Sequence, residues 1–280
     1  MRTISASEVT RAVAEICVRA NYDLPSDVEQ AIEKAIQAEE SPLGLEILRQ
    51  LLENSRIARA EGLPICQDTG LAVVFADVGQ DVHVTDGDLA EAIQEGVRRG
   101  YEEGYLRKSV VAHPLDRVNT GDNTPAVIHF EIVPGDRLRL VVAPKGAGSE
   151  NMSALRMLKP SDGADGVKRF VVETIAAAGA NPCPPIVVGI GLGGTMEKVA
   201  LLAKKALLRD LGERSRKSLD ATLEDELLEL VNRTGIGPSG LGGRVTALAI
   251  HVESCPCHIA SLPVAVNIQC HAARHAEVTL

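Results

Sequence analysis

The chain has 280 residues, of which 45% are hydrophobic and 24% charged, and its formal net charge is −9. This balance is typical of a globular protein and argues against a disordered chain. The negative charge repels a phosphate backbone, and aromatic residues, which form base-stacking platforms, make up only 2%. Nucleic acid is therefore not an expected partner.

No apolar stretch reaches the ~18 uncharged residues that a membrane-spanning helix needs, so no membrane partner is expected. The first residues lack the basic-then-apolar order of a secretory signal. We therefore expect a cytoplasmic protein, in which reducing conditions disfavour disulfides. On that expectation, metal binding, catalysis or packing accounts for the six cysteines better than pairing does.

The first sixty residues predict three helices. Val9, Val13 and Ile16 recur at the spacing of one helix face. Ser26 and Pro42 are residue types that open helices, and each precedes a further apolar run at helical spacing. We therefore expect a helical segment at the start of the chain.

Beyond residue 70, strands and helices alternate. Expected strands cover residues 71–78, 126–133, 137–143, 186–190, 245–252 and 262–268, and expected helices cover residues 88–104, 152–158, 163–180, 196–211 and 219–231. The turn sequence Pro134-Gly135-Asp136 predicts a hairpin between the second and third of these strands.

Together these elements predict a mixed α/β (α+β) fold. N-terminal helices would precede a mixed or antiparallel sheet with flanking helices. No internal repeat or low-complexity linker divides the sequence. We therefore treat residues 1–280 as one region, with a weakly marked subdomain boundary near residues 181–185.

Three cysteines, Cys66, Cys183 and Cys270, stand among glycine, proline and small polar residues. Such segments are typical of loop ends, where a thiolate can face a ligand without disturbing a core. The three are far apart and form no Cys-x-x-Cys pair, so their spacing leaves metal binding and simple packing open. The tightest pair is Cys255-Pro256-Cys257, but a turn at a strand end explains it as well as ligation does.

Two glycine-rich segments are candidate ligand-binding sites. The segment 189–194 matches GxGxxG, yet no second parallel strand with an acidic end is expected within about 20 residues, so we interpret it as a tight strand-to-helix turn and not as a dinucleotide site. The segment 145–151 is a glycine-rich loop that enters the helix expected at residues 152–158. Its backbone N–H groups suit a substrate carboxylate, although a plain turn explains its composition equally well.

Three further side chains are candidates for chemistry. Arg107 offers the planar, two-point contact that a carboxylate prefers. Asp68 lies two residues after Cys66, where a nearby metal site and low solvent access would favour an acid or base. His258 is a possible hydrogen-bonding partner of a cluster, substrate or aspartate, although a single histidine is more often structural.

The sequence contains, in consistent order over roughly residues 10–278, the strings ICQDTG, RKSVVAHPLDRVNTGDNTP, KGAGSENMSAL, NPCPP, GIGLGGT, GIGPSGLGG and NIQCHAARH. In these strings it resembles the α, or N-terminal, region of class I fumarate hydratases. The closely related L(+)-tartrate dehydratase α subunits share them. The resemblance is specific to the superfamily and much less specific to the substrate.

This resemblance implies a [4Fe–4S] cluster held by Cys66, Cys183 and Cys270, with one iron left without a protein ligand. Such an iron is a Lewis acid for carboxylate and hydroxyl oxygens. Asp68 matches the family's catalytic acid and also a substrate contact. The other matches to substrate-holding positions are Gln67, Arg107, Gly148, Asn151, Met152 and Ser153, and His258 matches a histidine near the active site.

The implied activity is the reversible addition of water to fumarate, which gives (S)-malate. The family completes its active site with a second region that carries a Thr, further Arg residues and a Lys. The ten residues after Cys270 cannot supply it. We therefore expect a separate β subunit, joined with this chain in a heterotetramer.

Three alternatives remain open at this stage. The first, dehydration of L(+)-tartrate to oxaloacetate, differs least from the implied activity, because one or two polar side chains would decide between tartrate and malate as the substrate. A redox or sensing iron–sulfur protein would need a fourth ligand, such as Cys255 or Cys257. A structural zinc site on those cysteines and nearby histidines would hold zinc and no iron.

Overall fold

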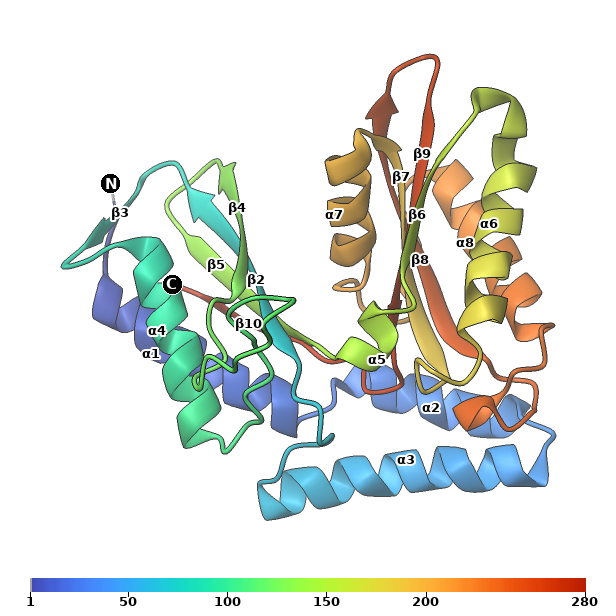
Figure 1. Cartoon of the computed structure of the whole chain (residues 1–280), viewed down its shortest axis with the longest axis horizontal. Coiled ribbons are helices and arrows are strands. Elements are labelled where there is room, and N and C mark those ends of the chain that lie inside the picture. The colour runs from blue at the N-terminus through green and yellow to red at the C-terminus, as the bar shows by residue number, and fades with distance from the viewer. Residues whose placement is uncertain (1) are drawn as a thin grey trace. The chain divides into compact units, whose positions relative to one another are not determined.

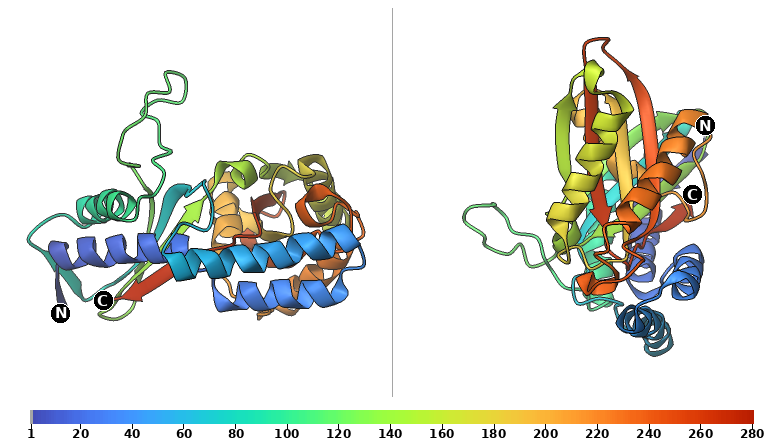
Figure 2. Two further views of the ribbon diagram at one scale, coloured as in Figure 1. Left: turned by 90° about the horizontal axis from the view of Figure 1, so that it is seen from below. Right: turned by 90° about the vertical axis from the view of Figure 1, so that its right-hand side faces the viewer.

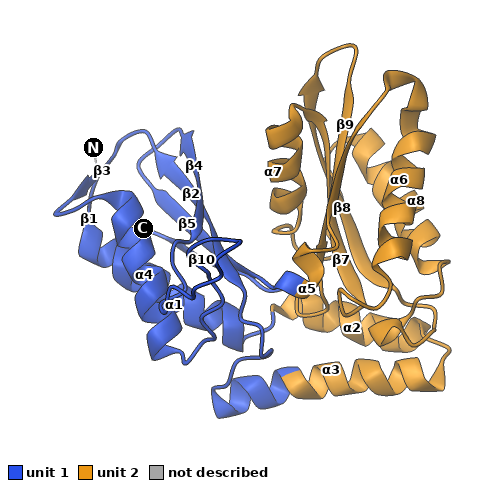
Figure 3. Cartoon of the chain, in the orientation of Figure 1, with its two compact units in different colours: residues 1–24, 55–147, 274–280 blue, residues 25–54, 148–273 orange. Residues whose placement is uncertain are grey.

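The computed structural model describes residues 2–280, which fall into two compact units (Figure 3). Of the described residues, unit 1 comprises 2–24, 55–147 and 274–280, and unit 2 comprises 25–54 and 148–273. The fold is mixed α/β, as predicted. The boundary expected near residues 181–185 falls inside unit 2. Among the described residues, no helix has the length and apolar character needed to cross a membrane.

The chain begins with a short strand, β1 (Arg2–Ser5), and three helices, α1 (Ala6–Tyr22), α2 (Ser26–Ala38) and α3 (Pro42–Glu61). The Ser5 side chain accepts a hydrogen bond from the backbone N–H of Glu8 at 3.3 Å, so a capping serine sets the start of α1. The prediction of three helices in this segment is confirmed.

The unit 1 sheet has the strand order β10-β5-β2-β4 (Figure 1). Its strands are β2 (Leu71–Gly79), β4 (Val127–Val133), β5 (Leu138–Lys145) and β10 (Ala276–Thr279). Helices α1 and α4 (Leu89–Glu103) supply Val9, Val13, Ile93 and Val97 to one buried cluster with side chains of β2 and β5. A separate short strand, β3 (Val82–Thr85), pairs in parallel with β1.

The hairpin predicted for residues 126–143 is wrong, although both segments are strands. Strand β2 lies between them, parallel to β4 and antiparallel to β5. The turn between β4 and β5 passes around the end of β2, where Gly79 N–H donates to the Arg137 carbonyl at 2.8 Å and Gln80 N–H donates to the Val133 carbonyl at 2.8 Å. Residues 72–76 of β2 are all buried, which suits a central strand that lies between two neighbours.

The unit 2 sheet has the strand order β6-β9-β7-β8 (Figure 1). Its strands are β6 (Ala154–Leu158), β7 (Ile186–Gly194), β8 (Ala247–Cys257) and β9 (Leu262–Gln269). Strands β7 and β8 are parallel, and the other neighbours are antiparallel. Helices α6 (Gly163–Ala178) and α8 (Ser218–Asn232) pack on one face and α7 (Met196–Ala206) on the other.

The GxGxxG segment lies within β7 and serves helix packing. A Cβ atom at Gly189 or Gly191 would lie 2.1 Å from the carbonyl oxygen of Ala203 or Val199, respectively, in α7. Glycine therefore lets α7 lie directly on β7. Gly193 and Gly194 then take positive φ angles of 86° and 70° at the end of β7. The strand therefore continues through the segment predicted as a tight turn, and only its last two residues begin the turn towards α7.

The helix predicted at residues 152–158 is also wrong. A four-residue helix, α5 (Ala147–Glu150), comes first, and residues 154–158 form strand β6. This strand pairs with β9, and Ser153 Oγ accepts the Ile268 N–H at 3.1 Å just before it. A segment this short gains little as an isolated helix, so pairing with β9 decides its conformation.

His251 of β8 is a buried histidine, only 2% exposed, with Nδ1 3.1 Å from the Ala206 carbonyl oxygen. Burial, together with the positive charge of Arg209, lowers the pKa of His251 to about 4. The neutral form is therefore the one that folding favours at neutral pH.

We predict that acid destabilises the fold through His251. The imidazole of His251 is protonated near pH 6.5 in the unfolded chain and only near pH 4 in the folded chain. The free energy of unfolding therefore decreases as the pH falls from 6.5 to 4, and the decrease is about 2 kcal/mol at pH 5. Urea unfolding at pH 7.5 and pH 5 measures the loss. His251→Gln should remove most of it, whereas the exposed His83→Gln should not. Equal pH dependence in the wild type and His251→Gln would contradict the prediction.

Candidate functional site

The loop that carries Cys66 leads into β2 of unit 1, and buried donors hold its end. Tyr101 Oη donates to the carbonyl oxygens of Thr69 at 2.7 Å and Gly70 at 3.2 Å. Asn123 Nδ2 also donates to the Gly70 carbonyl, at 3.2 Å. Gly70 has φ of +72°, and a Cβ there would lie 2.6 Å from the Lys145 nitrogen, so only glycine fits this turn.

Both carboxylate oxygens of Asp68 accept backbone hydrogen bonds. Oδ1 accepts the Gly70 N–H at 3.0 Å, and Oδ2 accepts the Ala147 N–H at 2.9 Å. The backbone carbonyl of Asp68 accepts a third bond, from Arg274 Nη2 at 2.6 Å. Ala147, in the glycine-rich loop at residues 145–151, thus binds the Asp68 carboxylate through its backbone N–H, and the contact of this loop with a substrate carboxylate stays a prediction.

The other predicted residues of unit 1 flank this loop. Thr69 Oγ1 donates to the Arg107 carbonyl at 3.1 Å, which fixes the Arg107 backbone beside the loop while its side chain is exposed. Cys66 is partly exposed, and its Sγ accepts the Asp68 N–H at 3.4 Å. Gln67 is exposed, with its Oε1 3.6 Å from the Cys66 sulfur. Unit 1 thus brings together Cys66, Gln67, Asp68 and Arg107.

Unit 2 gathers most of its predicted residues at one end of its sheet. Cys183 lies three residues before β7 begins, Ser153 directly precedes β6, and Cys270 directly follows β9. The register places these strand ends together, because Val187 pairs with Gln269 in the β7–β9 ladder. The residues gathered at this end are Gly148, Asn151, Met152, Ser153, Cys183 and Cys270.

Hydrogen bonds join the two cysteine loops of unit 2. The Cys183 carbonyl accepts the His271 N–H at 3.3 Å, and His271 Nδ1 lies 3.0 Å from the same oxygen. Cys183 has a positive φ of 54°, which is uncommon for a non-glycine residue. Cys183 is exposed and Cys270 is partly exposed, so both thiols are accessible to a ligand.

His258 is not brought to this end. It lies in the loop between β8 and β9, whereas Cys270 lies at the other end of β9. The eight residues of β9 separate the two ends by roughly 25 Å. Within unit 2, His258 is therefore distant from Cys183 and Cys270.

The donor set fits an iron–sulfur cluster, whose usual ligands are thiolates. Cys66, Cys183 and Cys270 all lie on loops, and none of them is fully buried. Burial raises the pKa of Cys17 to about 12, which disfavours the thiolate a ligand needs. Within residues 2–280, neither unit by itself brings three His, Cys, Asp or Glu side chains together as a metal site. The three predicted cysteines are divided between the units.

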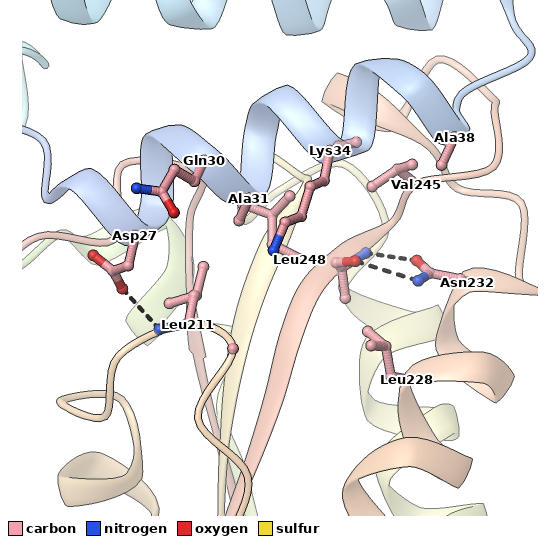
Figure 4. A pocket seen from close by; sticks show the side chains of 13 residues that line it. Asp27, Gln30, Ala31, Lys34, Ala38, Leu211, Leu228, Asn232, Val245 and Leu248 are labelled. Carbon is pink, nitrogen blue, oxygen red and sulfur yellow. Dashed lines mark hydrogen bonds between the residues drawn. The ribbon is translucent and has the colours of Figure 1, made fainter.

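A pocket of about 260 Å³ lies elsewhere in unit 2, beneath α2 (Figure 4). Lys34 and Ala31 of α2 line it opposite Leu248 of β8, and Asp27 accepts the Leu211 N–H at 2.7 Å at one end. No predicted site residue lines this pocket. It gives no support for placing the chemistry there.

Sequence reasoning missed the residues that hold the Asp68 loop. Arg274 is 5% exposed, and Tyr101 is fully buried. Tyr101 falls on the inward face of an amphipathic helix, where it resembles any core residue. Arg274 follows Cys270 by four residues, in the string NIQCHAARH, and this position was the one available signal.

The chain belongs to the fumarate hydratase (Fumerase) family, whose model matches residues 10–279. Fumarate hydratases are hydro-lyases, so the family places the chain among enzymes that add or remove water.

Two relatives illustrate the similarity. The chain is 48% identical over 275 residues to a protein of Methanocaldococcus jannaschii provisionally named L(+)-tartrate dehydratase subunit alpha, and the alignment covers 96% of each chain. It is 33% identical over 285 residues to the L(+)-tartrate dehydratase subunit alpha of Escherichia coli (strain K12), covering 98% of this chain and 93% of the relative. Dehydratases of this kind are likewise hydro-lyases.

We predict that Tyr101→Phe loosens the Asp68 loop. The substitution removes the hydroxyl that serves two carbonyls in a buried setting, and the free energy of unfolding should fall by about 1–3 kcal/mol. Urea unfolding of the purified chain measures this. Tyr105→Phe is the matched control, because Tyr105 is 88% exposed and should tolerate the change. Equal losses in the two variants would show that the buried hydroxyl has no special role.

Proposed function

We propose that this chain is the cluster-binding α subunit of a hydro-lyase that adds water reversibly to fumarate, giving (S)-malate. The observation that carries the proposal is the bonding of Asp68 to Ala147 and Arg274. Gly148 directly follows Ala147 in the sequence, and Cys270 precedes Arg274 by four residues. Within unit 1, these bonds fix the loop that carries Cys66.

Cys66, Cys183 and Cys270 are the proposed ligands of a [4Fe–4S] cluster. When bound, the cluster would supply an iron without a protein ligand as a Lewis acid for the carboxylate and hydroxyl oxygens of the substrate. The match of the fumarate hydratase family to residues 10–279 supports this assignment.

The remaining roles belong to side chains and backbone of this chain. We assign proton transfer to Asp68, whose two N–H partners fix the carboxylate while each oxygen keeps a further lone pair. Arg107 would hold one substrate carboxylate through its exposed guanidinium. Gln67, Gly148 and residues 151–153 are the proposed contacts to the rest of the substrate.

Two elements of the proposal lie beyond a single chain. A separate β subunit would supply the Thr, Arg and Lys residues that complete the site, and the relatives' name "subunit alpha" supports such a partner. His258 lies at the opposite end of β9 from Cys270. If His258 contributes to an active site, we therefore expect that site to belong to another chain of the assembly.

Dehydration of L(+)-tartrate is the second candidate function. The observation that favours it is the name of the relatives, both of which are called L(+)-tartrate dehydratase subunits. The two reactions share C–O bond chemistry beside a carboxylate, and they differ in one hydroxyl group of the substrate. A site that hydrogen-bonds that hydroxyl would discriminate strongly against a substrate that lacks it.

We predict that Asp68→Asn abolishes most turnover while the cluster stays bound. Loss of an acid–base group should lower kcat by about 10²–10⁴-fold. Malate-to-fumarate conversion by the complex of both subunits, with iron content measured on the same sample, tests this. Asp81→Asn, at an exposed aspartate outside the site, should leave both unchanged. Loss of iron in Asp68→Asn would show that Asp68 is structural.

We predict that the chain turns over no dicarboxylate by itself and gains activity when its β subunit is added. Steady-state assays with malate, fumarate and L(+)-tartrate measure kcat/KM for each. A higher value for malate and fumarate supports the fumarate hydratase assignment, and a higher value for tartrate replaces it with the second candidate. Full activity of the chain alone would contradict the two-subunit proposal.

A further inference from the structure

Residues 108–123 form an extended arm that projects from unit 1 (Figure 2). Its two sides are tied to each other along its length. Val111 and Asn119 form a β-bridge, Ala112 N–H donates to the Val118 carbonyl at 2.8 Å, and Asn119 Nδ2 donates to the Lys108 carbonyl at 3.0 Å. The arm is therefore an ordered ribbon held by its own hydrogen bonds.

The base of the arm is fixed to the body of unit 1. Ser109 N–H donates to Asn123 Oδ1 at 2.7 Å, and Arg98 of α4 pairs with Asp122 at 2.9 Å. Although burial opposes it, hydrogen bonds from Arg98 and Thr124 lower the pKa of Asp122 to about 2. The ion pair at the base is therefore present throughout the neutral range.

The outer part of the arm makes an unusual surface. Residues 112–119 are all exposed, and they include Leu115 at 87% and Val118 at 59% exposure. Arg117 is exposed in the same segment, and Arg107 and Lys108 lie at the base of the arm. The arm has two acidic residues to balance these three cations, Asp116 and Asp122, and Asp122 is already paired with Arg98. An apolar tip with basic flanks thus projects from a chain whose net charge is −9.

We propose that this arm docks the separate subunit that completes the active site, an inference that rests on the proposed function. Arg107, a proposed substrate contact, directly precedes the arm, and its carbonyl is bonded to Thr69, the residue after Asp68. A subunit that supplies side chains to a substrate held by Arg107 has to approach the base of the arm. The arm begins at the residue after Arg107.

The chemistry of the arm defines the surface it fits. Leu115 enters an apolar pocket of the partner, where removing it from water stabilises the complex. Acidic side chains of the partner face Arg117 and Lys108, so binding weakens as ionic strength rises. Because the ribbon is already ordered, little conformational entropy is lost when it docks.

The test measures binding of this chain to a tagged β-type subunit from the same organism, by sedimentation at low and high salt. Leu115→Glu should weaken the complex at least tenfold, and Arg117→Glu should reduce the salt dependence. The matched control is Leu219→Glu, because Leu219 is 84% exposed near the start of α8 in unit 2, away from every proposed site residue, and this variant should bind normally. Circular dichroism and urea unfolding establish that each variant folds.

Equal affinity of Leu115→Glu and the wild type would overturn the proposal, as would failure of the wild-type chain to bind the β-type subunit. If Leu115→Glu instead converts a dimer of this chain to a monomer and leaves subunit binding intact, the arm serves a second copy, and the assignment is wrong. Binding and turnover are read separately. A complex that depends on Leu115 but lacks hydro-lyase activity would leave the docking role standing and reject the proposed function.

Discussion

The carboxylate of Asp68, held by the N–H groups of Gly70 and Ala147, is the interaction on which the site depends. One oxygen closes the turn into β2, and the other accepts the N–H of Ala147, the first residue of α5. These bonds orient the loop two residues after Cys66. The turn itself needs glycine at position 70, because any side chain there would collide with the Lys145 backbone.

The same loop meets the chain at two of the points where it passes between the units. Ala147 is the last residue of its segment of unit 1, and Arg274 is the first residue of the next such segment. Ala147 donates to the Asp68 carboxylate, and Arg274 donates to the Asp68 carbonyl. Gly148 and Cys270 therefore follow or precede residues that the Cys66 loop holds in place.

Much of the fold follows from local sequence pattern. The helices at the start of the chain, the buried strand after Gly70 and the strand at residues 186–190 have strong periodicity or long apolar runs, and each is present. The pairing of strands, in contrast, does not follow from local pattern. The turn at residues 134–136 predicts a chain reversal, but it cannot reveal that β2, from much earlier in the sequence, lies between β4 and β5. Likewise, residues 154–158 become a strand only because β9 is available to pair with them.

The site shows the same division between local and long-range information. Cys66, Cys183 and Cys270 stand out because glycine, proline and polar neighbours mark their loops. The side chains that orient those loops, such as Tyr101 and Arg274, are buried and carry no local mark. Their roles arise from contacts between residues 31 to 206 positions apart, which a single sequence does not display.

Iron and sulfide analysis of the anaerobically prepared chain tests whether Cys66, Cys183 and Cys270 hold a cluster. About four irons are expected in each chain, as a [4Fe–4S] cluster requires. Cys66→Ser, Cys183→Ser and Cys270→Ser should each lose the iron, whereas Cys257→Ser should keep it. Zinc in place of iron, or full iron content in Cys66→Ser, would contradict the assignment of these cysteines as cluster ligands.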